Sequence, residues 1–510
     1  MITRRALLGA GAAGAAGAAG AAGAAVPATR ALGLGAVPWS RLGGHLSGDL
    51  VLPSNARYAT AKQLAVMEFD AIAPQAVAYC ADARDAALCL AFAQDNGLAP
   101  AVRSGGHSAA GYSTGTGLVV DVSRLDSVRV GGGSVTLGPG AQNVDVLNTL
   151  ADSGLALTGG ACPTVAAGGF IQGGGLGFLT RPLGMTCDAL TSATVVLASG
   201  QTVTASAREH PDLFWALRGG GGGNFGIVTS YTLTPTALSQ VTTAQLAYTY
   251  DQALDMLDGY SRWLAECPRT IGSAAVVTLA DAAPGNVPTP SVIVVSTGTP
   301  AELDAELARL DSLTGTPAPR QTSVLPYRDL MTGIFGCAEK TTEECHRSGA
   351  FPQGQLPRTA FALERSRLVR DAVPRDGWAR ILALFDDQRV SGGQTHGLQV
   401  LPIDGATWDL DRTATAFVHR DSRFSVNFQG FVAQGPVTDE LRTAARAWVD
   451  AGFTAVDPLS SGEAYQNFID PELADWKTSY YAENYPQLVK VKNRYDPHGL
   501  LSFAQGIGAA

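Results

Sequence analysis

The sequence predicts an α+β protein with more than one domain, and three observations support that class. The chain has 510 residues, more than a single hydrophobic core usually organises. Apolar residues make up 46% of it and charged residues 16%, as is typical of a buried globular fold. Short runs of strand type alternate with helical stretches from residue 76 onwards, and this pattern changes after Pro235.

Before Pro235, short apolar runs that indicate strands alternate with amphipathic stretches that indicate helices. The expected helices cover residues 83–96, closed by Gly97, and 143–153. The expected strands cover residues 76–79, 118–122, 134–137, 193–198 and 227–233, and a further strand begins at Ala101. This half therefore predicts an α+β unit with mixed sheets.

After Pro235, helices and strands follow in a pattern that favours an antiparallel sheet covered by helices. The expected helices cover residues 251–265 and 301–313, and the expected strands cover 274–279, 291–296 and 413–431. Residues 284–290 and 315–319 are rich in Pro, Gly and Thr, which indicates surface loops.

Residues 1–31 differ from the rest of the chain. They begin with Thr3-Arg4-Arg5-Ala6-Leu7-Leu8 and continue as a run of Ala and Gly, which indicates an export signal of twin-arginine type. A membrane anchor is the alternative, although Ala and Gly offer little apolar surface to hold a helix in lipid. We expect a secreted or extracytoplasmic protein that has no membrane attachment once the signal is removed.

Charge and cysteine content limit the partners. A net charge of -9 argues against nucleic acid and against an anionic membrane, which leaves a small molecule as the expected partner. No Cys-x-x-Cys pair or histidine cluster with metal spacing occurs, so we predict no metal. Among seven cysteines, Cys337 and Cys345 lie in a short polar loop where a disulfide can close in an oxidising compartment.

Residues 103–108 read Arg-Ser-Gly-Gly-His-Ser and carry the first chemical signal. Two glycines let the backbone approach a ligand closely and expose consecutive N–H groups, which suits a diphosphate. His107 directly follows that turn, so we expect it at the ligand. A loop histidine without a chemical role is the alternative.

Two further glycine-rich segments strengthen that interpretation. Residues 159–177 contain eight glycines, and Arg218 is followed by five more. Neither segment has the order of strand, Gly-x-Gly-x-x-Gly turn and helix that marks a dinucleotide fingerprint. The three segments instead predict a pocket lined by backbone around a flat, extended ligand.

These segments, with Tyr480-Tyr481-Ala482-Glu483-Asn484-Tyr485 and Lys492-Asn493-Arg494-Tyr495-Asp496-Pro497, resemble the berberine-bridge-enzyme-like flavoproteins of the vanillyl-alcohol oxidase superfamily. The resemblance covers about residues 74–506 and is tightest over 100–230. It implies an FAD-linked oxidoreductase with a PCMH-type FAD-binding domain of two subdomains. The implied parts are residues 40–235 for FAD, 236–460 for substrate and 461–506 as a segment that returns to the FAD domain.

The resemblance also implies how FAD is held. His107 would bond the 8α-methyl carbon of the flavin, and Cys162, in Cys-Pro-Thr-Val, would bond ring carbon C6; a thiolate is the strongest nucleophile available for that bond. Cys187 is the competing cysteine, at a position that the family does not bond. The remaining cofactor-binding residues that we expect are Arg103, Ser104, Gly105, Gly106, Ser108, Thr164, Val165, Gly168, Gly169, Gly173, Gly174, Gly226, Ile227, Asn467, Tyr481 and Asn484.

Removing hydride from a carbon that bears a hydroxyl group requires a base for the hydroxyl proton. Relatives use a tyrosine in a Tyr-x-Asn pattern, which Tyr465 and Asn467 match; on a strand, alternation would place both on one face. A tyrosine packed in the sheet is the alternative. Asn427 is the expected catalytic helper, since relatives place an amide or acid facing the cleft there, and Asp404 is the other candidate.

Two more positions bear on the reaction. Val165 stands three residues after the expected bonded cysteine, where valine is typical of relatives that react with oxygen. Leu176 departs from relatives that carry an aromatic residue there, which puts substrate stacking at that site in doubt.

We therefore expect a secreted oxidase that acts on an alcohol or hemiacetal carbon. The expected substrate is a sugar, an oligosaccharide or a glycosylated secondary metabolite, and O2 is the acceptor that becomes H2O2. The alternatives are a flavin dehydrogenase, an oxidative cyclase, and a binding protein that holds flavin without turnover.

Overall fold

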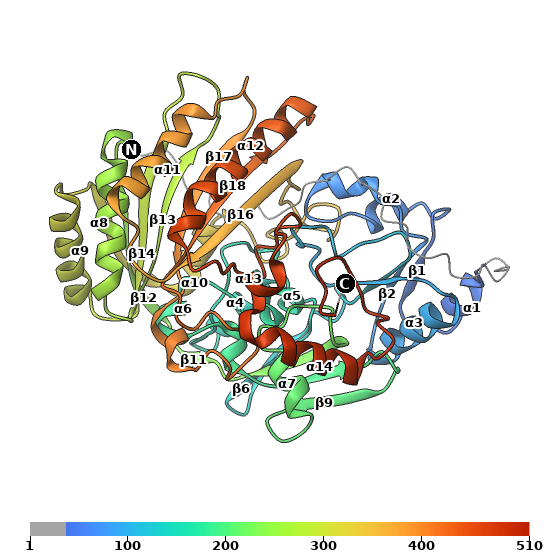
Figure 1. The fold of residues 1–510 in the computed structure, drawn as a ribbon. Coiled ribbons are helices and arrows are strands. Elements are labelled where there is room, and N and C mark those ends of the chain that lie inside the picture. The colour runs from blue at the N-terminus through green and yellow to red at the C-terminus, as the bar shows by residue number, and fades with distance from the viewer. Residues whose placement is uncertain (1–36, 509–510) are drawn as a thin grey trace.

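A computed structural model describes residues 37–508, shown in Figure 1. The export signal predicted for residues 1–31 lies outside the described residues. Sheets of four, five and seven strands dominate the described part of the chain, with helices beside them. The predicted α+β class is confirmed.

The four-stranded sheet holds the start of the glycine-histidine segment. Its strands lie in the order β1 (Asp49–Val51), β2 (Ala76–Tyr79), β4 (Leu118–Asp121) and β3 (Pro100–Arg103). Strand β4 runs parallel to both β2 and β3, so the carboxyl ends of these three strands share one edge. Helix α3 (Ala83–Asp95) begins where the Asp82 side chain accepts a hydrogen bond from the Asp85 amide at 2.9 Å.

A five-stranded antiparallel sheet lies beside it. Its strands lie in the order β5 (Val128–Gly131), β6 (Ser134–Leu137), β10 (Ile227–Leu233), β8 (Leu190–Val196) and β9 (Thr202–Ser206). The helices of this part are α4 (Asn143–Ala151), α5 (Ala167–Gln172), α6 (Thr180–Leu183) and α7 (Pro211–Ala216). The short strands β7 (Leu155–Ala156) and β11 (Thr236–Ala237) pair with each other.

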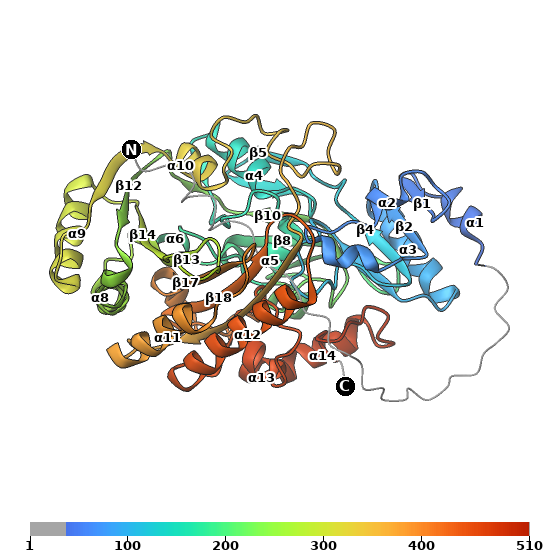
Figure 2. The same ribbon diagram turned by 90° about the horizontal axis from the view of Figure 1, so that it is seen from above.

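The seven-stranded sheet is antiparallel throughout. Its strands lie in the order β15 (Arg320–Pro326), β12 (Gln240–Ala247), β14 (Thr289–Ser296), β13 (Ile271–Leu279), β17 (Thr395–Pro402), β18 (Phe424–Val432) and β16 (Phe361–Val369). Four helices cover one face of it (Figure 1): α8 (Ala253–Glu266), α9 (Pro300–Thr314), α11 (Arg375–Asp387) and α12 (Asp439–Val456). The other face turns toward the two smaller sheets, as the view from above shows (Figure 2).

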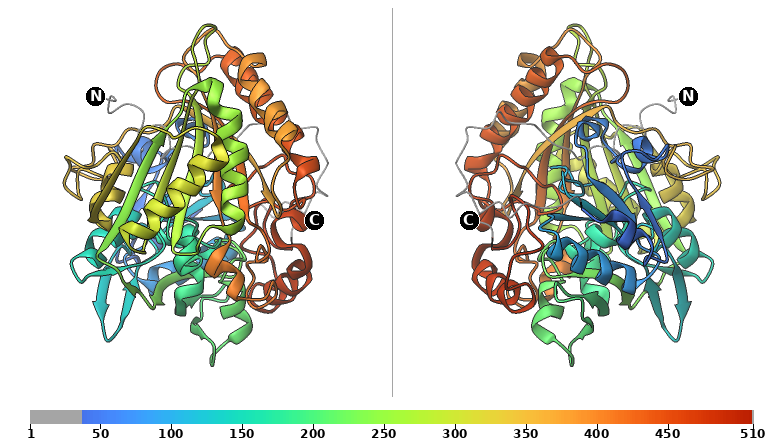
Figure 3. Two further views of the ribbon diagram at one scale, coloured as in Figure 1. Left: turned by 90° about the vertical axis from the view of Figure 1, so that its left-hand side faces the viewer. Right: turned by 90° about the vertical axis from the view of Figure 1, so that its right-hand side faces the viewer.

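The last segment of the chain returns to the five-stranded sheet. Helix α12 ends near β16, and the chain then forms α13 (Trp476–Tyr481) and α14 (Tyr485–Tyr495), which Figure 3 shows below the large sheet. Leu488 and Tyr495 share a buried core with Phe214 and Phe225 from the middle of the chain. The Lys492 ammonium bonds Asp496 at 2.7 Å and the Asn224 carbonyl at 2.7 Å, which anchors α14.

The remaining α-helices of the described residues are α1 (Trp39–Gly43), α2 (Tyr58–Ala61) and α10 (Tyr327–Ile334). Within residues 37–508, no helix combines the length and apolar character needed to cross a membrane.

Two sequence predictions about strands are wrong. The strand expected over 413–431 begins only at Phe424, because the preceding residues form turns held by ion pairs. Arg420 bonds both carboxyl oxygens of Asp188, and His419 bonds Glu463 at 2.7 Å. Tyr465 is not on a strand either; it leads into a turn.

Candidate active site

A cavity of about 730 Å³ lies between the uncovered face of the seven-stranded sheet and the glycine-rich segments. Its volume falls in the range of sites that bind cofactors and small molecules. The predicted site residues that line it are Ser104, Gly105, Gly106, His107, Ser108, Cys162, Thr164, Val165, Gly168, Gly169, Gly226, Tyr465, Asn467 and Tyr481. The two loops that carry His107 and Cys162 and the C-terminal segment that carries Tyr465 therefore line the same cavity, although they are distant in sequence.

The glycine-histidine segment leaves β3 at the shared carboxyl edge of the parallel strands. Arg103 fixes its base, since its guanidinium bonds Asp121 at 2.5 Å and the Ala61 carbonyl at 2.6 Å. Gly106 has a φ of +71°, a conformation that favours glycine. A side chain at Gly105 would meet the Ala166 amide nitrogen at 2.8 Å, so glycine is required there for the two loops to approach.

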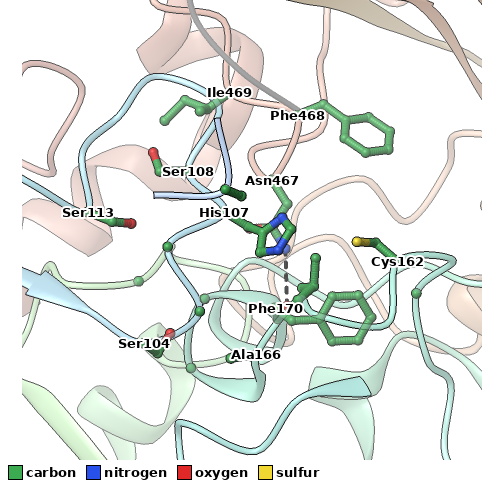
Figure 4. A pocket seen from close by; sticks show the side chains of 18 of the residues that line it. Ser104, His107, Ser108, Ser113, Cys162, Ala166, Phe170, Asn467, Phe468 and Ile469 are labelled. Atoms are coloured by element: carbon green, nitrogen blue, oxygen red, sulfur yellow. Dashed lines mark hydrogen bonds between the residues drawn. The ribbon is translucent and has the colours of Figure 1, made fainter. Parts of the chain in front are cut away.

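His107 and Cys162 reach the cavity from separate loops, as Figure 4 shows. Thr164 connects them: its Oγ1 lies 2.8 Å from Nε2 of His107 and 3.7 Å from Sγ of Cys162. Engaging Nε2 orients the imidazole and leaves Nδ1 as the second ring nitrogen. The two predicted nucleophiles thus share one hydroxyl group.

Burial controls the ionisation of both side chains. Burial, aided by the positive charge of Arg347, lowers the pKa of His107 to about 3, so the imidazole is neutral at ordinary pH. Burial raises the pKa of Cys162, while hydrogen bonds from the Thr164 hydroxyl and from the amides of Thr164 and Val165 counteract the shift. A neutral imidazole and a thiol with nearby donors are both able to act as nucleophiles.

The second glycine-rich segment supplies a backbone wall. Gly168 packs so closely on Ser104 that an added Cβ would lie 2.7 Å from the Ser104 hydroxyl. Gly169, by contrast, has no atom within 4 Å of the place where a Cβ would stand, and it lines the cavity. Such an open backbone surface fits a flat ligand pressed against it.

Tyr465 presents its phenol group to the cavity from the C-terminal segment. The phenolic oxygen accepts hydrogen bonds from the Gly175 amide at 2.9 Å and from the Asn467 side chain at 3.0 Å. Burial raises the pKa of Tyr465 above its usual value, and these two donors oppose that rise. The turn, in place of the expected strand, still brings Tyr465 and Asn467 together.

The sheet contributes an acid that the sequence did not single out. Glu364 on β16 lines the cavity and is fully enclosed, and burial raises its pKa to about 7. Its Oε2 accepts hydrogen bonds from the side chains of Asn427 at 3.1 Å and Gln429 at 3.4 Å. Glu364 lies between Leu363 and Arg365 on β16, and this run carries no motif. Only the alternation of the strand, which turns Glu364 toward the uncovered face of the sheet, distinguishes it.

Several predicted residues lie behind the cavity wall. Asn427 does not line the cavity. It lies two residues before Gln429 on the same face of β18 and supports Glu364 through the hydrogen bond from its side-chain amide. Asp404 is held by Arg181 at 2.6 Å, away from Tyr465. The other predicted residues that do not line the cavity are Arg103, Gly173, Gly174, Ile227 and Asn484.

Contacts within the fold account for the positions of the predicted residues that do not line the cavity. Asn484 donates hydrogen bonds to the Arg412 and Thr415 carbonyls, and Ile227 is fully buried in the core of the four-stranded sheet. Gly173 leaves room for the Asn467 side chain. The competing cysteine, Cys187, is buried in the core and does not line the cavity.

The sequence also made predictions about a disulfide and about metal binding. Cys337 and Cys345 are joined by a disulfide, and His346 beside it lies 3.0 Å from Asp145. Among the residues that the structure describes, no cluster of three or more His, Cys, Asp or Glu side chains could hold a metal ion.

Comparison with known proteins identifies the class. Residues 74–206 match the FAD binding domain family, and residues 464–508 match the family described as berberine and berberine like. The chain is 29% identical to YgaK of Bacillus subtilis, an uncharacterised FAD-linked oxidoreductase, over 85% of this chain and 91% of that protein. It is 28% identical to the xylooligosaccharide oxidase of Thermothelomyces thermophilus over 86% and 88% of the two chains.

A solved structure shares the fold. Glucooligosaccharide oxidase from Acremonium strictum, described as carrying 6-S-cysteinyl, 8α-N1-histidyl FAD, superposes with a TM-score of 0.78. It is 22% identical in sequence, and the match covers 90% of this chain and 97% of that one. The fold and the matched domains define an FAD-binding oxidoreductase. More specifically, the chain carries an FAD binding domain and a berberine and berberine like segment, and relatives similar to it over most of their length are named FAD-linked oxidoreductases and oxidases.

Proposed function

We propose that this chain is an exported oxidase that holds FAD through covalent bonds from His107 and Cys162. It would oxidise an alcohol or hemiacetal carbon of a sugar, an oligosaccharide or a glycosylated metabolite with dioxygen. The observation that carries the proposal is the meeting of both nucleophiles at the Thr164 hydroxyl, in a cavity that Tyr465 also lines. The xylooligosaccharide and glucooligosaccharide oxidases among its relatives support a sugar substrate.

The residues present fit the cofactor. Backbone N–H groups of the glycine-histidine loop would hold the diphosphate, and the open surface at Gly169 would lie against the ring system. His107 would attack through the nitrogen that Thr164 does not engage. Cys162 would react as the thiolate, which the Thr164 and Val165 amides favour.

FAD, when bound, would supply a hydride acceptor that passes its electrons to dioxygen. Tyr465 would receive the proton of the substrate hydroxyl, because the Gly175 amide and the Asn467 side chain both donate to its oxygen and so favour its charged form. Val165 lines the same cavity and, as a short side chain, leaves space for dioxygen.

Because burial keeps Tyr465 protonated near neutral pH, Tyr465 would accept the substrate proton only as it passes its own phenol proton to a second group. Glu364 suits this task because it lines the cavity and its pKa is about 7. The two amides that hold its Oε2 fix its orientation without neutralising its charge. The proposed reaction therefore uses Tyr465 as the base and Glu364 as the group that accepts the released proton.

The test combines cofactor mapping with turnover. We expect the acid-precipitated protein to be yellow, and peptide mass mapping to find the flavin on both His107 and Cys162. Peroxide should form with members of an oligosaccharide panel, and Tyr465→Phe should abolish it while keeping the covalent flavin. Tyr248→Phe, a buried tyrosine outside the cavity, is the matched control and should behave as the wild type.

Three outcomes would contradict the proposal. A colourless acid precipitate would exclude covalent flavin. Slow reoxidation of substrate-reduced enzyme by oxygen would favour a dehydrogenase over an oxidase. No bleaching of the flavin across the panel, with Tyr465→Phe indistinguishable from wild type, would favour a protein that holds flavin without turnover.

A further inference from the structure

We propose that Arg347 binds the diphosphate of FAD, together with the backbone amides of the Ser104–Ser108 loop. The inference rests on the proposed function for the place of the diphosphate at that loop, and it does not depend on the covalent bonds. Arg347 belongs to the part of the chain assigned to the substrate, residues 236–460, and it lines the cavity. It lies in the loop of residues 346–359, here called the Arg347 loop, which contains no glycine-rich motif.

Backbone contacts hold the Arg347 loop in place. Leu356 pairs with the two residues that flank Arg347. Its amide donates to the His346 carbonyl and its carbonyl accepts from the Ser348 amide, each at 2.9 Å. The Cys337–Cys345 disulfide closes the chain directly before this pairing. The fold therefore fixes the backbone on both sides of Arg347.

The Arg347 loop is also bonded to the glycine-histidine loop through one intervening residue. The Thr359 amide donates a hydrogen bond to the Ala65 carbonyl at 3.2 Å. The Ala65 amide in turn donates to the Gly106 carbonyl at 3.0 Å. Two hydrogen bonds thus connect the end of the Arg347 loop to the turn whose amides would face the diphosphate.

The charge of Arg347 acts at the ends of the parallel strands. Tyr79, Arg103 and Asp121 are the last residues of β2, β3 and β4, which share one carboxyl edge. Arg347 interacts electrostatically with all three of them and with His107. The guanidinium therefore stands where the glycine-histidine loop leaves β3, and the proposed function puts the diphosphate at this loop.

Arg347 has no counter-charge within the part of the chain that the structure describes. Among the described residues, the arginine and lysine side chains that line the cavity are Arg347 and Arg358. Arg358 bonds both carboxyl oxygens of Asp70, at 2.9 and 2.5 Å. The nearby carboxylate of Asp121 bonds Arg103 at 2.5 Å. The Nε and Nη1 atoms of Arg347 are buried and find no hydrogen-bond partner among the described residues.

Arg347 nevertheless keeps its charge. Burial, together with the positive charges of Arg103 and Arg358, lowers the pKa of Arg347 to about 10, so the guanidinium is protonated at neutral pH. A buried charge without a partner is costly, and proteins match such a charge with an opposite one. Backbone amides donate hydrogen bonds to a diphosphate but do not neutralise it, whereas a guanidinium also supplies positive charge and can bond two phosphate oxygens at once. FAD would therefore supply the anion that Arg347 lacks.

The experiment measures the binding of flavins and requires no turnover. The full-length His107→Ala/Cys162→Ala double variant removes both proposed attachment points, so that bound flavin is free to dissociate. Equilibrium dialysis gives its dissociation constants for FAD and for riboflavin, which has the same ring system but no phosphate. Adding Arg347→Met should weaken FAD binding at least about 10-fold, as the loss of a charge-assisted hydrogen bond predicts, and should leave riboflavin binding nearly unchanged.

Three further variants serve as controls in the same double variant. Arg347→Lys keeps the positive charge and should recover most of the FAD affinity that Arg347→Met loses. Arg328→Met removes a half-exposed arginine outside the cavity and should change neither dissociation constant. Arg347→Gln replaces Arg347→Met should the latter fold poorly, and the denaturation midpoint in urea reports folding for each variant.

A second measurement uses the chain with His107 and Cys162 intact. Protein produced under riboflavin limitation is mixed with increasing concentrations of FAD, and the covalently attached flavin is measured after acid precipitation. In Arg347→Met, the FAD concentration that gives half of the maximal attachment rate should rise by about the same factor as the dissociation constant.

Each result decides one question. Unchanged FAD affinity in folded Arg347→Met and Arg347→Gln, with normal covalent flavin and peroxide release, would overturn the inference and leave the proposed function standing. An equal loss of affinity for FAD and riboflavin would also overturn it, because the contact would then not be to phosphate. Arg347-dependent FAD binding in a chain that never forms covalent flavin would support the inference while refuting the proposed bonds to His107 and Cys162.

Discussion

The Thr164 hydroxyl links the two residues that are proposed to bond FAD, so Thr164→Val tests whether that link promotes bond formation. Valine has nearly the shape of threonine but no hydroxyl group, and it should keep the packing of the Cys-Pro-Thr-Val loop. The substitution removes the 2.8 Å hydrogen bond to Nε2 of His107 and the 3.7 Å contact with Sγ of Cys162. His107 would then turn more freely, and the Cys162 thiolate would lose one donor.

The size of the effect follows from these contacts. Leaving a buried polar group without its partner costs about 1–3 kcal/mol. If the hydrogen bond is needed in the transition state of bond formation, this corresponds to flavin attachment that is roughly 5- to 150-fold slower. Both bonds should slow, because one hydroxyl serves both side chains.

Covalent incorporation over time is the direct measurement. Protein produced under riboflavin limitation is mixed with FAD, and samples are acid-precipitated at intervals and analysed by peptide mass mapping. Thr164→Ser, which keeps the hydroxyl group, is the matched control and should stay within a few-fold of the wild-type rate. Wild-type rates for both bonds in Thr164→Val would refute the role assigned to this hydroxyl.

Two further predictions concern pH and stability. Proton acceptance by Glu364 requires its ionised form, so kcat/KM should rise as the pH increases through about 7, and Glu364→Gln should remove this rise; a rise of wild-type size in the variant would exclude Glu364. The Cys337–Cys345 disulfide closes a loop with a sequence separation of 8, which corresponds to about 2.5 kcal/mol of stabilisation by chain entropy, so the double Cys→Ser variant should show a lower denaturation midpoint in urea. An unchanged midpoint would show that the loop is held by its other contacts alone.

The regular elements were predictable because their sequence periodicity matches their burial. Strand β10 has the predicted bounds, and α9 extends the predicted helix by a residue at each end. The prediction failed over residues 413–423, where buried polar side chains depend on distant partners. His419 pairs with Glu463 and Arg420 pairs with Asp188, and no local pattern reveals an ion pair between residues so far apart in sequence.

The same reasoning explains which parts of the site the sequence revealed. Contiguous motifs predicted many of the residues that line the cavity, since neighbouring residues in a loop reach the same space. On the sheet, Asn427 was the expected residue, and alternation did place it on the same face as Gln429. The sequence does not show which residue of that face reaches the cavity. That depends on where the strand lies relative to the loops opposite it, which only the folded structure determines.

Charge pairing decides which of the remaining groups are available for chemistry. Strand β16 carries Glu364 beside Arg365 and Arg367, and both arginines bond aspartates from the C-terminal segments on the opposite face. Glu364 receives only amide donors in its hydrogen bonds. A buried acid without a counter-charge, on the wall of a cavity, is expected where a substrate supplies the missing group. Glu364 comes from the part of the chain without recognisable motifs, so the sequence alone was least able to identify the cavity wall that the seven-stranded sheet supplies.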